Sequence, residues 1–501
     1  MNRLGELLTL DLAQDVIPEK RGMMMMRVSK DVGGAMTEKK IPVLIKPRER
    51  TGQDALMENL EQTSKWVNIV VLDLSGAHIL KKGARMLAGI LQNCPELIRI
   101  DLASNELGEV GVESLAAVLG QCRLLTHLNL QHNWIRAQGA RSLVQVLTHC
   151  KSLCRLHLRL NDIGDEGVGM LAAALGQCAS LAYLDLGNNE IGARGATSLA
   201  AALGHCESLA HLDLSSNEIG DEGAARLAAT LGQCASLAYL DLRDNEIGAE
   251  GMERLAVGLG QCASLAHLDL SENEIGAEGA ESLAAVLGQC ASLAHLDLSY
   301  NDLGDEGAAK LAVGLGQCAS IDRLYLRGNW FGAEGMQRLA VGLGQCASLA
   351  HLDLSENEIG AEGAESLAAV PGQCASLAHL DVSYNNLGDE GAESLAAVLG
   401  HCPSLVHLDL HENQIGDEGA MTLVQALQQP CVSLAHLNLD GNKIGDEGAR
   451  SLVTGLEHCT LLAHLDLSYN EIGTEWVERL EAVQGQCRSL AHLVVEHQAL
   501  S

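Results

Sequence analysis

Most of this chain repeats one pattern of apolar and polar residues every 28 residues. Near the start of one unit, Leu268 and Leu270 alternate with the polar residues His267 and Asp269. Alternation of this kind is typical of a β-strand with one buried face. The pattern therefore predicts a short strand at this position of every unit.

A helix follows each predicted strand. In the same unit, Ala280, Leu283, Ala284 and Leu287 are spaced i, i+3, i+4 and i+7, which places them on one side of a helix. Neither the strand nor the helix can bury its apolar side alone, so neighbouring units must stack on each other.

One Asn marks the end of each predicted strand. An amide both donates and accepts hydrogen bonds, so we expect it to satisfy backbone groups where the chain turns. The spacing predicts further units near Ala77 and Gln498, which gives about 16 units. The Asn residues are Asn105, Asn133, Asn161, Asn189, Asn217, Asn245, Asn273, Asn301, Asn329, Asn357, Asn385, Asn413, Asn442 and Asn470.

These units predict an α/β solenoid over residues 66–501. A helix is wider than a strand, so a stack of such units must curve with its strands on the inner side. We expect a horseshoe with a parallel sheet on the concave face and helices on the convex face.

Residues 1–65 lie outside the repeat and form a separate N-terminal segment, which we expect to be partly flexible. A strand at 41–45 is expected to cover the open edge of the sheet, followed by a short helix at 53–65. Residues 19–50 carry nine Lys and Arg against four Asp and Glu. Contact of this basic segment with a membrane or a partner is the alternative interpretation.

The charge of the chain is strongly negative beyond residue 65. The whole chain carries −32 and the first 65 residues carry +1, which leaves −33 on the repeats. Such a surface repels phosphate backbones, so we expect no nucleic-acid partner, and it attracts basic protein surfaces. No apolar run reaches the roughly 18 residues of a membrane span. Glu6 and Asp11 interrupt the apolar start, which argues against a secretory signal.

Fifteen of the 16 cysteines occupy one position of the repeat. One Cys per unit is not the disulfide framework of a small secreted domain, so we expect small buried side chains and a reducing compartment, the cytoplasm. Cys150, Cys154 and His157 have spacing that resembles a zinc site, but their side chains should not converge on one tetrahedron. We therefore expect no zinc site there, and no cofactor. The fifteen are Cys94, Cys122, Cys150, Cys178, Cys206, Cys234, Cys262, Cys290, Cys318, Cys346, Cys374, Cys402, Cys431, Cys459 and Cys487.

The outward positions of the strands form columns of like residues on the predicted concave face. One column holds His127, His211, His267, His295, His351, His379, His407, His436, His464 and His492, and the next holds Asp73, Asp101, Asp185, Asp213, Asp241, Asp269, Asp297, Asp353, Asp381, Asp409 and Asp466. Stacked carboxylates repel each other, and imidazoles that take up protons would compensate. An inert surface, a pH-responsive surface and divalent-metal binding all remain open. No nucleophile or oxyanion donor accompanies these residues, so we expect no enzyme.

The motifs LxxLxLxxN and IGxEGAxxLAxxL resemble the leucine-rich repeat of the ribonuclease-inhibitor type, over about 430 residues. The wording NEIGDEGA most resembles the repeats of NOD-like receptors, and Ran GTPase-activating proteins share this class. The resemblance implies a horseshoe and a binding role. This chain differs from these relatives in three ways: it contains no P-loop, no long acidic tail and no alternation of repeat lengths.

A specific ligand is expected where the repeat departs from its own pattern. Two units depart most, and Tyr183, Tyr239 and Arg243 lie in columns between them. We predict that these residues anchor an acidic or mixed-charge protein partner, with drift in an unused repeat as the alternative. The first unit carries Arg155, His157 and Arg159, and the second carries Arg323, Tyr325, Arg327, Trp330 and Phe331.

The repeat architecture and the missing active-site residues favour a protein-binding scaffold in the cell, with no catalysis of its own. The resemblance leaves open an enzyme inhibitor like ribonuclease inhibitor, a GTPase activator of the Ran-activator type, and a fragment of a NOD-like-receptor-type sensor. The identity of the partner does not follow from the sequence.

Two local expectations complete the sequence analysis. Pro371 replaces the usual Leu near a helix end, which removes a core side chain and a backbone donor, so we predict a weak point there. The last strand is expected to leave a sheet edge open, through which copies of the chain can associate.

Overall fold

The structure is a computed structural model, and it describes residues 42–45, 53–64, 68–370, 376–399, 402–429, 432–485, 487 and 489–496. The strands are β1 (Pro42–Ile45), β2 (Asn68–Asp73), β3 (Arg99–Asp101), β4 (His127–Asn129), β5 (Arg155–His157), β6 (Tyr183–Asp185), β7 (His211–Asp213), β8 (Tyr239–Asp241), β9 (His267–Asp269), β10 (His295–Asp297), β11 (Arg323–Tyr325), β12 (His351–Asp353), β13 (His379–Asp381), β14 (His407–Asp409), β15 (His436–Asn438), β16 (His464–Asp466) and β17 (His492–Val494).

One helix follows each strand from β2 to β16, and α2 precedes β2. The helices are α2 (Gln53–Ser64), α3 (Leu80–Leu91), α4 (Gly108–Leu119), α5 (Arg136–His149), α6 (Gly164–Leu175), α7 (Ala193–Leu203), α8 (Gly220–Leu231), α9 (Ala249–Leu259), α10 (Gly276–Leu287), α11 (Gly304–Leu315), α12 (Ala333–Leu343), α13 (Gly360–Ala368), α14 (Gly388–Leu399), α15 (Asp417–Leu427), α16 (Asp446–Leu456) and α17 (Thr474–Gln484).

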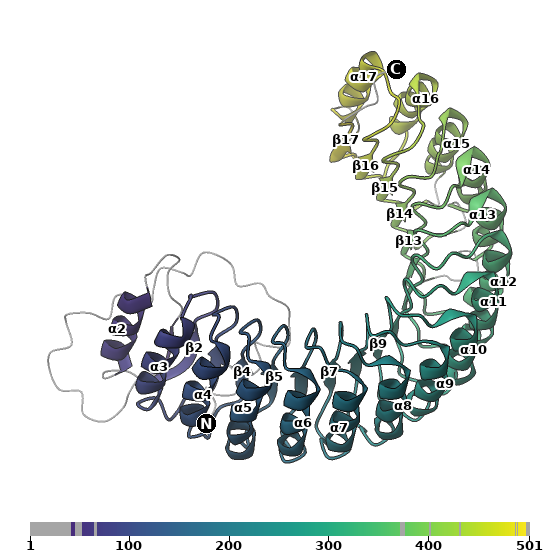
Figure 1. Ribbon diagram of the computed structural model, residues 1–501. Helices are drawn as coiled ribbons and strands as arrows, with labels where there is room; N and C mark the ends of the chain where they lie inside the picture. Colours follow the sequence, from purple (N-terminus) through teal and green to yellow (C-terminus); the bar gives the residue numbers. More distant parts are fainter. Residues whose placement is uncertain are drawn as a thin grey trace.

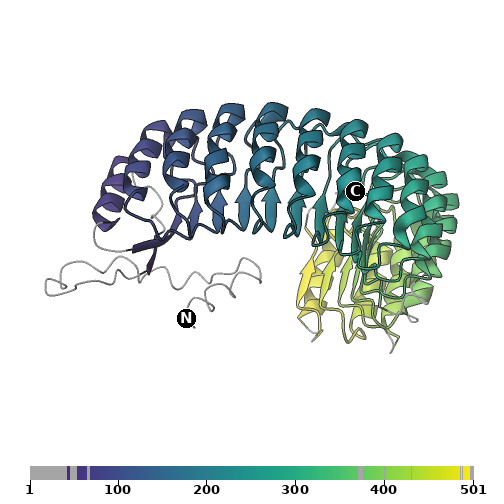
Figure 2. The same ribbon diagram turned by 90° about the horizontal axis from the view of Figure 1, so that it is seen from below.

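The chain forms the horseshoe that the repeat predicts, with the strands on the inner side and the helices on the outer side (Figure 1). Seen from below, the helices stand in one row, and the C-terminal half turns out of the plane of the first half (Figure 2). Consecutive strands pair in parallel and in register, so that His267 pairs with His295 and Asp269 with Asp297. This register turns the 28-residue period into straight columns of side chains across the sheet.

The core runs as one continuous layer between the sheet and the helices. Within one unit, Leu268 and Leu270 of the strand segment and Leu283 and Leu287 of α10 are each no more than 1% exposed. The same positions are buried from repeat to repeat, and together they form a single hydrophobic cluster. Stacking therefore supplies the burial that a single unit lacks.

The Asn column binds each repeat to its neighbour through hydrogen bonds. The Nδ2 group of Asn273 donates to the carbonyls of Leu242, Leu270 and Ser271, at 3.0 Å each. Its Oδ1 accepts from the backbone N–H groups of Asn245 and Ile247, at 3.1 and 3.0 Å. One amide thus satisfies five backbone groups, as the sequence predicted.

The cysteine column lies inside the fold, at the turn that follows each helix. Cys262 is 3% exposed, and its thiol donates to the carbonyl of Leu231 in the preceding repeat at 3.0 Å. Burial raises the pKa of this thiol to about 12, so it remains protonated. Cys374 and Cys431 lie outside the described residues.

At the N-terminal end of the sheet, β1 pairs in parallel with β2, which is where the sequence placed a covering strand. Leu56, Met57 and Leu60 of α2 are buried in the core. The stretch 1–41, which includes most of the basic segment, lies outside the described residues.

The helix before Pro371 ends early. α13 has 9 residues, whereas α14 in the next repeat has 12. Pro371 itself lies outside the described residues, so the weak point predicted there stays a prediction. None of the helices in the described part of the chain has both the length and the apolarity needed to cross a bilayer.

Candidate functional site

The concave face is built from the first and third residues of each strand. The middle residue points into the core, as the complete burial of Leu296 and Leu324 illustrates. The residues on either side, such as His295 and Asp297 in β10, remain partly exposed. Because the strands are in register, these positions form a ring column and a carboxylate column.

The ring column is a continuous stack of imidazole and phenol rings from β5 to β17. Rings of Tyr183, His211, Tyr239, His267 and His295 follow one another at centroid separations of 3.8 to 4.2 Å. Towards the C-terminus the separations widen to between 5.0 and 5.8 Å. Tyr183 and Tyr239, predicted as partner contacts, are thus members of this stack.

Burial within the stack favours the neutral form of several of its histidines. Burial lowers the pKa of His211 and of His267 to about 4, and it also lowers the pKa of His295, His351 and His407. At these positions, the lowered pKa values disfavour the alternative in which the imidazoles take up protons to compensate the carboxylates. Packed rings exclude the water that a charged imidazole needs.

In the carboxylate column, pKa values are raised instead. Burial, and next the charge of Asp269, raise the pKa of Asp241 to about 7, and the same two causes raise that of Asp297 to about 6. Local donors hold these side chains in place, since Oδ1 of Asp353 accepts from the backbone N–H of Ser355 at 2.9 Å and from its hydroxyl at 2.6 Å.

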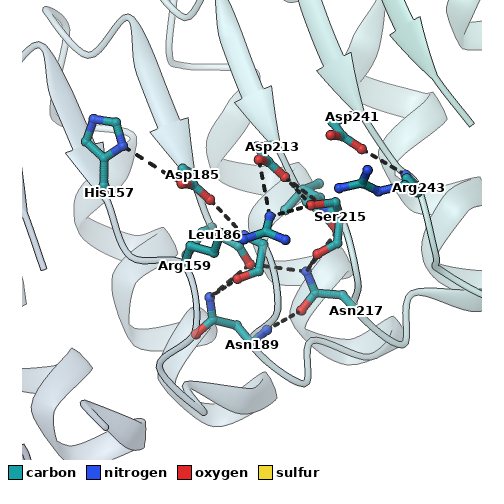
Figure 3. A network of polar contacts seen from close by, with 12 residues as sticks. His157, Arg159, Asp185, Leu186, Asn189, Asp213, Ser215, Asn217, Asp241 and Arg243 are labelled. Carbon is teal, nitrogen blue, oxygen red and sulfur yellow. Dashed lines mark hydrogen bonds and ion pairs between the residues drawn. The ribbon is translucent and has the colours of Figure 1, made fainter. Parts of the chain in front are cut away.

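Arg159 is used within the molecule. Its Nη1 donates to the hydroxyl of Ser215 at 2.7 Å and lies 3.6 Å from Oδ2 of Asp213, two strands further along the sheet (Figure 3). The guanidinium passes over Gly187, where a Cβ atom would lie 2.4 Å from Nη1. Gly187 replaces the Ser that is usual at this position of the repeat. This substitution leaves room for the Arg159 side chain and could have been noticed in the sequence.

The other residues predicted in the first unit lie beside this contact. His157 lies 3.8 Å from Asp185 through Nδ1, and its ring lies 4.5 Å from that of Tyr183, tilted by 36°. Arg155 is half-buried in β5, in register with Tyr183. Arg243 lies further along the same column as Arg159, beside Asp241 and Asp269, whose charges raise the pKa of its guanidinium.

In the second unit, on β11, the usual residues of both columns are replaced. Arg323 takes the place of the ring residue between His295 and His351, and Tyr325 takes the place of the carboxylate between Asp297 and Asp353. The ring of Tyr325 lies 5.0 Å from both histidine rings, so the stack stays continuous across β11. Arg323 is left exposed on the concave face.

Arg327 belongs to a clasp that spans three repeats. Its Nη2 donates to Oε1 of Glu356, the hydroxyl of Tyr300 donates to Oε2 of the same carboxylate at 2.8 Å, and the guanidinium lies 5.7 Å from the Tyr300 ring centroid. Trp330, on the same rim, is 64% exposed. Phe331 is fully buried, so its inclusion among the contact residues was wrong: it fills the core position that Ile or Leu takes elsewhere.

A second rim cluster escaped the sequence analysis. The Tyr384 hydroxyl lies 2.9 Å from Nε2 of His411, and Nδ1 of His411 lies 2.8 Å from Oδ2 of Asp440. His411 stands where the repeat usually has Ser, which was the available signal. Within the part of the chain that the structure describes, no group of three or more His, Cys, Asp or Glu side chains is arranged to hold a metal ion.

A family comparison accounts for the repeat. Matches to a family described as "Leucine Rich repeat" recur through the chain and cover more than half of it. The chain belongs to the leucine-rich repeat family. The matches leave out 313–344, the stretch that holds β11 and Trp330. They cover 121–144, 149–172, 177–200, 205–228, 233–256, 261–284, 289–312, 345–368, 373–396, 401–424, 431–453 and 458–475.

No curated protein matches the sequence of this leucine-rich repeat chain. Among solved structures, it is similar to an internalin (inlF) from Listeria monocytogenes, with 18% identity and a TM-score of 0.45. That similarity covers 87% of this chain and 94% of the internalin chain.

Proposed function

We propose that this protein is a non-catalytic binding scaffold that holds a protein partner on its concave face, centred on β11. The observation that carries this proposal is the simultaneous loss of the repeat pattern at four outward positions of one unit: Arg323, Tyr325, Arg327 and Trp330. Arg, Tyr and Trp dominate interface hot spots, and here four such residues lie in one unit.

The charges around β11 favour a partner of mixed charge. Arg159 and Arg327 already bind carboxylates of this chain, so they offer little to an acidic partner. Arg323 is the exposed cation on β11, in register with His295 and His351, and the carboxylates of the neighbouring strands lie one outward position further along. A partner with basic groups around a single acidic group complements this arrangement.

The experiment compares the wild type with the triple variant Arg323→Ala, Tyr325→Ala, Trp330→Ala as bait in affinity purification under reducing conditions. All three side chains lie at least partly in solvent, but Tyr325 also stacks between His295 and His351, so the melting temperature of each bait is measured to verify that the fold is kept. We expect a protein that the wild type retains to be lost from the triple variant. The convex-face variant Arg338→Ala is the matched control, and equal retention by all three baits would refute the proposal.

An inhibitor of basic ribonucleases is the second candidate function. It is supported by the net charge of −33 on the repeats and by the resemblance to repeats of the ribonuclease-inhibitor type. A titration of ribonuclease activity with the purified chain separates this function from the general scaffold. No particular contact among the described residues favours a GTPase activator or a NOD-like-receptor-type sensor.

We further propose that the protein works in a reducing compartment such as the cytoplasm. Free, buried thiols at successive repeats support this, because oxidation of Cys262 or its neighbours would bring a polar group into the core. Self-association through the outer edge of β17 is a separate proposal. Light scattering at high protein concentration tests it, and a monomer throughout would contradict it.

A further inference from the structure

We propose that β11 recognises a helix of the partner, which lies across the strands and presents one carboxylate to Arg323 between two cationic side chains bound by Asp297 and Asp353. This inference rests on the proposed function and specifies the partner of that same surface.

The first step is the anion-binding centre. Arg323 is exposed and forms no ion pair within the described residues, and it shares the outward face of β11 with Tyr325. The neighbouring rings of His295 and His351 stay neutral because burial lowers the pKa of both. Arg323 and Tyr325 therefore form an isolated pair of donors, which suits a carboxylate.

The second step is the pair of flanking carboxylates. In β10 and β12, Oδ1 of Asp297 and Oδ1 of Asp353 each accept a backbone N–H at 2.9 Å, from Ser299 and Ser355. Neither carboxylate takes part in an ion pair within the described residues, so Oδ2 is available to a cation. Both side chains are partly exposed on the concave face.

This chain itself shows how such a site takes a cation. Asp213 and Ser215 have the same arrangement, with Oδ1 of Asp213 accepting from the Ser215 backbone at 2.9 Å and from its hydroxyl at 2.7 Å. Arg159 then binds on the open side, to the Ser215 hydroxyl and Oδ2 of Asp213. We expect a Lys or Arg of the partner to take the corresponding place at Asp297 and at Asp353.

The third step is the spacing. Neighbouring strands lie about 4.8 Å apart, so Asp297 and Asp353 lie about 9.6 Å apart along their row. Arg323, in register with His295 and His351, lies on the strand between them and to one side of that row. A helix presents one residue per turn on a given side, at about 5.4 Å, through positions i, i+4 and i+7. An extended segment presents same-side residues about 6.7 Å apart and falls out of step within two strands. The spacing therefore favours a helix that follows the row of strands.

Three synthetic helical peptides on one Ala- and Gln-rich background test the inference against the full-length chain. The first carries Lys, Glu and Lys at i, i+4 and i+7, the second has the same composition with the charges spread around the helix, and the third carries Lys at all three positions. We expect the first to bind at least about tenfold more tightly than the second, a difference of about 1.4 kcal/mol. It should also exceed the third, although the third carries more positive charge.

The variant Arg323→Glu should reverse the order, so that the all-Lys peptide binds more tightly than the Lys-Glu-Lys peptide, while Arg338→Ala on α12 should leave the order unchanged. All-Lys binding as tight as Lys-Glu-Lys binding to the wild type, or no binding of any peptide, would overturn the inference. The proposed function has its own test, the affinity purification: it fails if the wild type and the triple variant retain the same proteins, whatever the peptides show.

Discussion

At the scale of single residues, Gly187 decides where the side chain of Arg159 goes. Arg159, Arg243 and Arg327 occupy the same position of three different repeats, yet only Arg159 reaches a carboxylate two strands away. In its path lies Gly187, where most other repeats have Ser or Arg. Arg327, with Ser355 in the corresponding place, binds Glu356 in the adjacent repeat instead.

The first prediction follows from this contact. Gly187→Ala places a methyl group on the Arg159 guanidinium and should separate it from Ser215 and Asp213, which should cost about 1 kcal/mol of stability. Urea unfolding measures the change. In an Arg159→Ala background the same substitution should cost less, because only the Ser215 hydroxyl, 2.9 Å from the added Cβ, and Asp213 then have to move. An equal loss in both backgrounds would contradict the assigned contact.

The second prediction concerns pH, where the two columns act in opposite directions. The neutral form of His211, with its pKa lowered from 6.5 to about 4, contributes stability above pH 6.5 that is lost as the pH falls through about 4. The neutral form of Asp241, with its pKa raised from 3.8 to about 7, contributes stability below pH 3.8 that is lost as the pH rises through about 7.

Asp241→Asn isolates the carboxylate effect, because the histidine contribution is common to both proteins. Asn keeps an oxygen to accept from the Arg243 backbone but cannot ionise beside Asp269. We expect the variant to be more stable than the wild type at pH 8, by on the order of 2 kcal/mol, and equal to it near pH 4. A difference in thermal unfolding that is the same at both values would rule this out.

At the scale of helices and strands, one Asp controls how the next helix begins. Oδ1 of Asp221 accepts from the backbone N–H groups of Gly248 and Gly251, at 2.8 and 2.9 Å, and so caps α9 from the preceding repeat. Gly248 is then extended, with φ −91°. Where the preceding repeat has Ala249 instead of Asp, Gly276 adopts the left-handed conformation, with φ +60°, and α10 begins there.

The third prediction tests this cap. Asp221→Ala removes two charge-assisted hydrogen bonds and should destabilise the protein by about 1 kcal/mol and speed amide exchange at the start of α9. The neighbouring Glu222 is largely exposed, 3.8 Å from Arg226, so Glu222→Ala should change little. Comparable losses from the two substitutions would exclude an inter-repeat cap.

The fourth prediction concerns the short helix α13. Pro371→Leu should extend α13 towards the length of α14, since it restores a backbone donor and a core side chain. Amide exchange in the last turn of α13 should slow to the rate of the matching turn in α14. Exchange that is already equally slow in the wild type would show that Pro371 creates no weak point.

At the scale of the whole molecule, the fold follows from the period of the sequence, whereas the site does not. Repetition of Leu and Asn every 28 residues predicts the register, the buried layer and the curvature, because each is a property of identical units in contact. The contacts of the Arg159 side chain depend on Gly187, 28 positions further along the chain, and on the carboxylate of Asp213, 54 positions further along. The repeat pattern carries no information about such exceptions.

The ring stack shows the same limit. Replacement of the ring residue by Arg323 suggests a break in the column, yet Tyr325 closes it from a different position of the same strand. Sequence identified both residues as exceptions and as partner contacts. Only the side-chain geometry shows that one completes an internal stack while the other remains exposed to solvent.

The central claim, that the partner binds the concave face around β11, is tested most directly by hydrogen exchange of the full chain with and without the retained protein. We predict slower exchange at the backbone amides of β10, β11 and β12 and of the rim that holds Trp330, with no change in the outward helices α10 to α12. Protection confined to those helices, or to strands far from β11, would contradict the claim.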